Sequence, residues 1–68
     1  MFTLYALVIG PSGEVVARLG PFATAAVARG ACTVEAGQML LWTRREQDWV
    51  AELDGREYRV PAEPALDA

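Results

Sequence analysis

The N-terminal part of the chain has patterns of apolar and polar positions that predict two strands. In Phe2–Ile9 both alternating rows are apolar, and aliphatic, β-branched and aromatic side chains predominate. In Glu14–Leu19 the two rows differ, which is typical of a strand with one buried face. Residues 10–13 (Gly-Pro-Ser-Gly) are turn formers, so we expect a β-hairpin that ends at Gly20-Pro21.

The next segment has the period and the end signals of a helix. Thr24 is a favourable N-cap, and Gly37 is suited to the left-handed conformation that ends a helix after about Ala36. One apolar stripe at helical spacing is expected to pack on the sheet. It consists of small residues and valines, namely Val27, Gly30, Ala31 and Val34.

Three further strands are predicted in the second half of the chain. The apolar run in Gln38–Arg44 is interpreted as a third strand. Asp48–Leu53 and Arg56–Val60 flank Asp54-Gly55, a favourable pair for a tight hairpin turn. That turn brings the larger apolar residues of both strands onto one face. They are Trp49, Ala51, Leu53, Tyr58 and Val60.

These elements together predict a two-layer α+β fold with the order ββαβββ, in which one helix packs on a mostly antiparallel sheet. We expect a single domain over residues 1–60, because 68 residues are too few for a second hydrophobic core. Residues 61–68 (Pro-Ala-Glu-Pro-Ala-Leu-Asp-Ala) are expected to form a short, disordered acidic tail.

Composition and charge narrow the classes of function. Apolar residues make up 53% of the chain and charged residues 22%, which is ordinary for a globular protein. The net charge of −3 disfavours a partner with a phosphate backbone. Every apolar run is too short to span a membrane, and the N-terminus lacks the basic segment of a signal peptide. We therefore expect a cytoplasmic protein with no membrane partner.

The residue types needed for catalysis and metal binding are scarce. Cys32 is the only cysteine and there is no histidine, so an intramolecular disulfide and a Cys–His pair are excluded and a zinc site is disfavoured. We expect Cys32 on a flank of the helix, as a structurally neutral thiol. Glu52 and Glu57 face each other across the predicted hairpin, with Arg59 close enough to relieve their repulsion. We assign no catalytic residue, metal site or cofactor, and expect a protein that is not an enzyme.

The first strand carries one apolar row more than a single helix can cover. The length of the hairpin loop decides whether Leu4 and Val8 or Leu7 and Ile9 belong to the uncovered row. Curling of the sheet, a second copy of the chain or another protein would each bury that row. We interpret the chain as a protein–protein interaction module, either a homodimer or a binder of a host protein. Its expected contact residues are Phe2, Leu4, Val8, Val16, Trp42, Arg44 and Arg45.

Nucleic-acid binding is the alternative function. The arginines of the C-terminal strands are interleaved with aromatic residues: Arg44, Arg45, Arg56 and Arg59 with Trp42, Trp49 and Tyr58. Arginine and aromatic side chains on a sheet clamp and stack single-stranded nucleic acid. Acidic residues in the same segment offset the positive charge, so this function ranks second.

A local motif resembles small phage proteins. Residues 20–24 read Gly-Pro-Phe-Ala-Thr, and an alanine-rich helix follows. A hairpin followed by this motif and such a helix resembles small accessory proteins of bacteriophages that infect GC-rich actinobacteria. The same start is similar to that of DNA-binding modules of phage integrases and of ubiquitin-like β-grasp proteins. The first resemblance implies an accessory protein that acts on a host protein.

Overall fold

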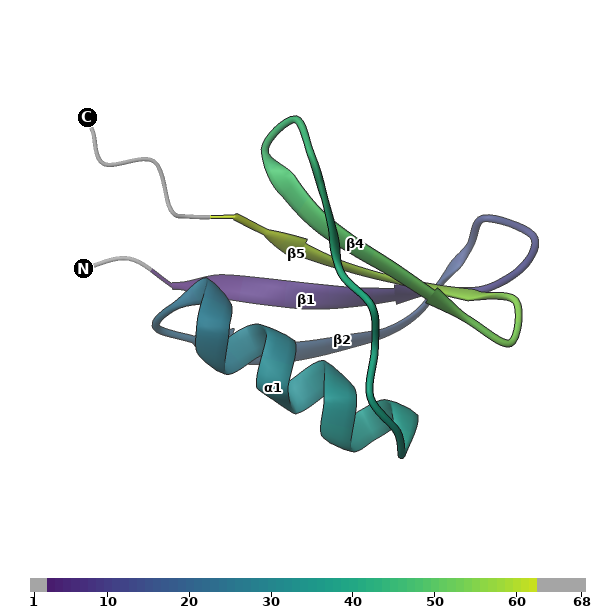
Figure 1. Ribbon diagram of the computed structural model, residues 1–68, viewed down its shortest axis with the longest axis horizontal. Coiled ribbons are helices and arrows are strands. Elements are labelled where there is room, and N and C mark those ends of the chain that lie inside the picture. Colours follow the sequence, from purple (N-terminus) through teal and green to yellow (C-terminus); the bar gives the residue numbers. More distant parts are fainter. Residues whose placement is uncertain (1–2, 63–68) are drawn as a thin grey trace.

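In the part of the chain that the structure describes, five antiparallel strands form one sheet, and one helix covers one of its faces (Figure 1). The computed structural model describes residues 3–62. Along the chain the elements are β1 (Leu4–Ile9), β2 (Val15–Phe22), α1 (Ala25–Ala36), β3 (Thr43–Arg45), β4 (Asp48–Leu53) and β5 (Arg56–Pro61). Across the sheet the strand order is β2-β1-β5-β4-β3, so β1 lies between β2 and β5. The predicted α+β class and the order ββαβββ are confirmed.

The register of the first hairpin decides which row of β1 faces the helix. Ala6 lies opposite Leu19, and Val8 lies opposite Ala17. The register shifts next to the loop, where Ile9 lies opposite Val15 and one extra residue of β2 is accommodated. The row under α1 is therefore Leu4, Ala6 and Val8, all of which are buried, and the row on the other face is Tyr5, Leu7 and Ile9.

Strand β2 continues beyond the point at which it was predicted to end. A second register shift lies near Gly20, which has φ 134°, and the strand reaches Phe22. Glycine tolerates this positive φ, and Pro21 is acceptable because β2 is an edge strand with no neighbour on its outer side among residues 3–62. The prediction that Gly20-Pro21 ends the hairpin is therefore wrong.

Both ends of α1 have the predicted caps. The Thr24 Oγ1 accepts a hydrogen bond from the Val27 N–H at 3.2 Å. Gly37 has φ 80°, and its N–H donates to the carbonyl oxygens of Thr33 and Val34 at 3.0 and 3.2 Å. These bonds satisfy backbone groups that have no partner within the helix, so they set its length.

The helix is rotated relative to the prediction. The buried stripe is Ala25, Ala28 and Cys32, whereas the side chains of Val27 and Val34 are 57% and 81% exposed. Large sheet residues fill the space beneath α1, so only small helical side chains fit between the two layers. The core-facing assignment of Val27 and Val34 and the flank position of Cys32 are therefore wrong. The sheet side of this core consists of Leu4, Ala6, Val8, Ala51, Tyr58 and Val60.

The second hairpin has the predicted register. Asp54 and Gly55 have φ 55° and 81°, and Ala51 lies opposite Tyr58. The sheet extends further than expected at its end, because Pro61 belongs to β5 and the Ala62 N–H donates to the Gln47 carbonyl at 2.8 Å. The expected tail thus begins no earlier than residue 63, and residues 63–68 lie outside the described residues.

The connection from α1 to β3 is a strap, residues 38–42, rather than the strand predicted for Gln38–Arg44. Of the residues between α1 and β4, only Thr43–Arg45 pairs with β4. The strap crosses in front of the sheet from the end of α1 (Figure 1). Leu40 is buried in the core, and Trp42 is packed against it. The few residues of the strap must lead the chain from the helix layer to the sheet layer, which leaves the second half of β4 without a neighbour on its outer side in the described chain.

Alanine at Gly20 tests the strained backbone of β2. An added Cβ would lie 3.0 Å from the Tyr5 ring and 3.1 Å from the Leu4 carbonyl oxygen, at a φ that alanine rarely adopts. Gly20→Ala is expected to lower the free energy of unfolding by about 1–3 kcal/mol in urea titrations followed by circular dichroism.

Gly30→Ala is the matched control. Gly30 lies within α1, and a Cβ there would meet no atom of the described residues within 4 Å. The substitution is expected to raise the free energy of unfolding by roughly 0.5–1 kcal/mol. A neutral effect of Gly20→Ala would contradict the left-handed backbone at this position.

Candidate functional site

The sheet face opposite α1, here called the open face, is partly covered by arginine side chains. Leu7 lies between Arg18 on β2 and Arg59 on β5. The Arg18 guanidinium lies over the Tyr5 ring, with its Cζ 4.6 Å from the ring centroid. Arginine stems cover apolar neighbours while their charged ends stay in water. Leu7 and Ile9 are thus half-buried within the chain itself, whereas Tyr5 remains exposed.

An ion-pair network fixes Arg59 on the open face. Its Nε and Nη2 donate to the Glu57 carboxylate at 2.9 and 2.6 Å, and its Nη1 donates to the Asp48 carboxylate at 3.2 Å. The hydrogen bond with Glu57, followed by the charges of Glu57 and Asp48, raises the pKa of Arg59 above its usual value. Glu52 lies opposite Glu57 as predicted, but Glu57 is bound by Arg59, so the two carboxylates have different surroundings.

Two of the expected contact residues on the first hairpin are core residues. Leu4 and Val8 lie beneath α1 and are buried, so they are not available to a partner. The register shift near the loop placed them there, and the sequence left that register open. Val16 is exposed as expected, whereas Phe2 lies outside the described residues.

The arginines expected to act together lie in different places. Arg44 pairs with Trp49 and Arg45 with Asp48, so the two arginines project from opposite faces of β3. Arg59 lies within the ion-pair network of the open face. Arg56 lines a hollow at the far end of the sheet, and Trp42 packs partly against the core. The predicted cluster of arginine and tryptophan is therefore dispersed.

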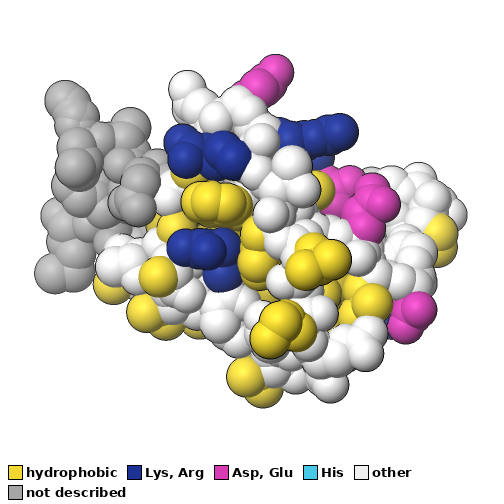
Figure 2. All heavy atoms as spheres, viewed as in Figure 1, with side chains coloured by type: hydrophobic (Ala, Val, Ile, Leu, Met, Phe, Trp, Pro, Cys, Tyr) yellow, Lys and Arg dark blue, Asp and Glu magenta, His cyan; other side chains and the backbone are white. Residues whose placement is uncertain are grey.

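A different arginine pair forms around Trp49, and we call Arg29, Trp49 and Arg44 the arginine stack. The Cζ atoms of Arg29 and Arg44 lie 4.5 and 5.5 Å from the centroid of the Trp49 ring. Figure 2, which views the helix side of the molecule, shows basic side chains on two sides of a hydrophobic one, left of centre. Arg29 was not foreseen, because no local signal in the helix relates it to a tryptophan far along the chain.

The most exposed aliphatic side chains lie on the same side of the molecule, on α1 and the strap. We call Val27, Val34, Met39 and Leu41 the helix-side patch. Val34, Met39 and Leu41 are 81%, 81% and 84% exposed. Figure 2 shows hydrophobic side chains over the helix and the segment that follows it, beside the basic ones. The sequence contains the signal, since these residues are large apolar residues of the helix and of Gln38–Arg44, but their pattern predicts a core-facing position for Val27 and Val34 and a strand for Met39 and Leu41.

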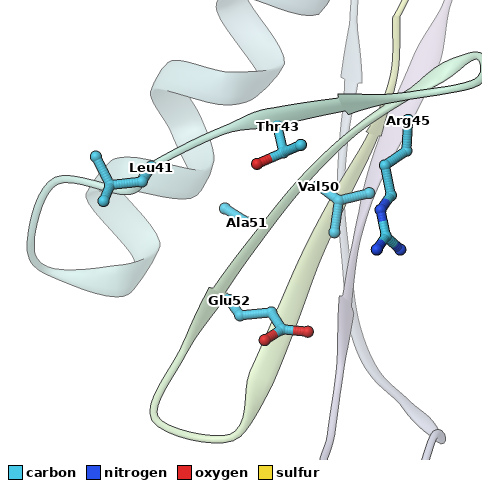
Figure 3. A pocket seen from close by; sticks show the side chains of 6 residues that line it. All are labelled: Leu41, Thr43, Arg45, Val50, Ala51 and Glu52. Atoms are coloured by element: carbon cyan, nitrogen blue, oxygen red, sulfur yellow. The ribbon is translucent and has the colours of Figure 1, made fainter.

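A shallow hollow lies between the strap and β4 (Figure 3). It is lined by Leu41, Thr43, Arg45, Val50, Ala51 and Glu52. It exists because β3 pairs with only the first half of β4. Its charged side chains are those of Arg45 and Glu52. Among the described residues, no group of three or more Cys, Asp or Glu is placed to hold a metal ion.

The thiol of Cys32 is poorly suited to nucleophilic chemistry. Its side chain is fully buried between α1 and the sheet. Burial, followed by the charge of Glu35, raises its pKa to about 11. Since the thiolate is the nucleophilic form, the folded protein presents a protonated, inaccessible thiol at neutral pH.

Comparisons with protein-family models, with curated proteins and with solved structures found no match. Within residues 3–62, no helix has the length and apolar character needed to cross a membrane. The candidate site is therefore defined by surface chemistry: the helix-side patch together with the adjacent arginine stack.

Aspartate on each row of β1 tests the assignment of the two faces. Leu4→Asp places a carboxylate in the core and is expected to abolish cooperative thermal unfolding, because an unpaired buried charge is strongly destabilising. Leu7→Asp places it between Arg18 and Arg59 and is expected to keep the fold. Circular dichroism at increasing temperature measures both. Loss of structure in Leu7→Asp, or a folded Leu4→Asp, would contradict the assignment.

The Cys32 thiol predicts a decrease in stability at alkaline pH. Its pKa is about 11 in the folded protein and about 8.5 in an unfolded chain. The folded state keeps the proton after the unfolded state has lost it, so the contribution to stability is complete below about pH 8.5 and is lost as the pH rises to about 11. The free energy of unfolding should fall by about 3 kcal/mol more than in Cys32→Ala. Urea titrations between these pH values measure the difference, and parallel profiles would contradict it.

Proposed function

We propose that this protein is a non-enzymatic protein–protein interaction module that binds its partner through the helix-side patch. The observation that carries the proposal is the exposure of Val34, Met39 and Leu41, each above 80%, on one short stretch of α1 and the strap. Apolar surface that is exposed in this way is typical of sites that a partner covers. The contact site thus differs from the one expected on β1.

The form of the helix supports a close contact with a partner. Val27, Gly30, Ala31 and Val34 have the spacing of one helical face, and this face points away from the sheet. A Cβ at Gly30 would meet no atom of the described residues within 4 Å, so the backbone of a partner has room to approach α1 there. Val27 and Val34 flank the small residues Gly30 and Ala31, and this arrangement is suited to packing against another apolar surface.

The proposal also covers the type of activity, the location and the origin of the protein. A non-enzymatic role agrees with the raised pKa and the burial of Cys32. The nucleic-acid alternative is disfavoured by the dispersal of the four C-terminal arginines and by the net charge of −3. A cytoplasmic location, an origin in a phage or another mobile element, and a host protein as partner rest on the sequence alone.

Substitution of the patch tests the proposal. A photoreactive amino acid in place of Leu41 would crosslink the partner in cells that express the protein, and light scattering over a concentration series would show whether the partner is a second copy. With the purified partner, Leu41→Asp and Val34→Asp are expected to weaken binding at least about tenfold in calorimetry, because a carboxylate replaces a buried contact.

Val15→Asp is the matched control. Val15 is also an exposed aliphatic residue, but it lies at the start of β2 rather than on α1 or the strap. This variant is expected to bind like the wild type. Unchanged binding in both patch variants, or an equal loss in Val15→Asp, would overturn the assignment of the patch as the contact site.

A further inference from the structure

The arginine stack holds two guanidinium groups in fixed positions at the surface. Arg29 comes from α1 and Arg44 from β3, and both lie over the indole of Trp49. Trp49 belongs to β4 and is partly buried against the core. Stacking on an aromatic ring orders long arginine side chains before any ligand arrives. A ligand that binds these groups therefore loses less affinity to the ordering of side chains.

Both guanidinium groups lack an acidic partner within residues 3–62. The ion pairs found among these residues are those of Arg59 with Glu57 and Asp48. The Nε atom of Arg29 is buried and has no hydrogen-bond acceptor in the described part of the chain. A buried donor without an acceptor is unfavourable, and one on a charged group especially so. Neither arginine of the stack therefore has its charge neutralised by an ion pair within residues 3–62.

Carboxylate is the acceptor that fits this site best. Guanidinium groups bind carboxylates and phosphates through paired N–H donors. Both guanidinium groups lie over the indole and so compete with a nucleobase for stacking on it, and the net charge of −3 opposes a long polyanion. The helix-side patch next to the stack favours a ligand that has apolar side chains as well as carboxylates.

We infer that the arginine stack binds acidic side chains of the partner, so that the recognised segment combines Glu or Asp with aliphatic residues. This inference rests on the proposed function, because the apolar part of the segment would contact the helix-side patch. The partner segment is thus acidic as well as apolar: Arg29 and Arg44 bind its carboxylates, while Val34, Met39 and Leu41 bind its apolar side chains.

Titration with synthetic peptides tests the inference without the natural partner. The probes are a short peptide of alternating glutamate and leucine, the same peptide with glutamine for glutamate, and a thymidine oligonucleotide. Nitrogen-15 spectra of the arginine Nε–H groups report on each arginine separately. The glutamate peptide is expected to shift the Arg29 and Arg44 signals saturably, and the glutamine peptide is expected not to.

Three substitutions sharpen the test. Arg29→Gln and Arg44→Gln are each expected to weaken binding of the glutamate peptide about tenfold or more, because each removes charge-assisted hydrogen bonds. Arg56→Gln removes the same charge from the far end of the helix side and is expected to have little effect. Arg44 is exposed, so its variant remains informative if Arg29→Gln fails to fold.

Several results would overturn the inference. These are equal binding of both peptides, equal effects of Arg44→Gln and Arg56→Gln, and tighter binding of the oligonucleotide than of the glutamate peptide. A shift of the Arg29 signal in Glu63→Gln without ligand would also overturn it, since the acceptor would then come from the chain itself. If the patch variants weaken binding of the natural partner but Arg29→Gln and Arg44→Gln do not, the proposed function stands and this inference fails.

Discussion

The contact between small side chains of the helix and large side chains of the sheet is the constraint on which the rest of the structure depends. Ala25, Ala28 and Cys32 face the core, and the sheet fills that core with leucine, valine and tyrosine. Once the small stripe is turned inwards, the valines of α1 must point to solvent. The close approach of the layers and the exposed patch are therefore two results of one packing arrangement.

Features determined by local chemistry were predictable from the sequence. Asp54-Gly55 and the alternating pattern on either side of it specify the register of β4 and β5. Thr24 and Gly37 satisfy backbone groups at the two ends of α1 and so define its limits. Each of these signals acts over a few residues, and no information from distant parts of the chain is needed to interpret them.

Features determined by distant contacts were not predictable from the sequence. The helix has two apolar stripes at helical spacing, and only the size of the residues on the facing sheet decides that Ala28 rather than Val27 is buried. The same holds for the site. The arginine-rich segment indicates Arg44, but Arg29 joins it only because α1 packs beside Trp49. Likewise, the strap does not form a strand because it must connect the helix layer to the sheet layer. The apolar residues of the strap do not by themselves indicate this connection.

The edges of the sheet affect how readily copies of the molecule associate through backbone hydrogen bonds. β2 has a register shift towards each end and contains Pro21, and the opposite edge, β3, is only three residues long. Irregular or short edges are poor templates for the addition of a further strand. Addition of a further strand is thus obstructed at β2 and β3, whereas the second half of β4 leaves a short stretch of backbone without a strand neighbour in the described chain. Contacts between copies of the chain therefore depend more on its surface side chains than on the backbone of these two edges.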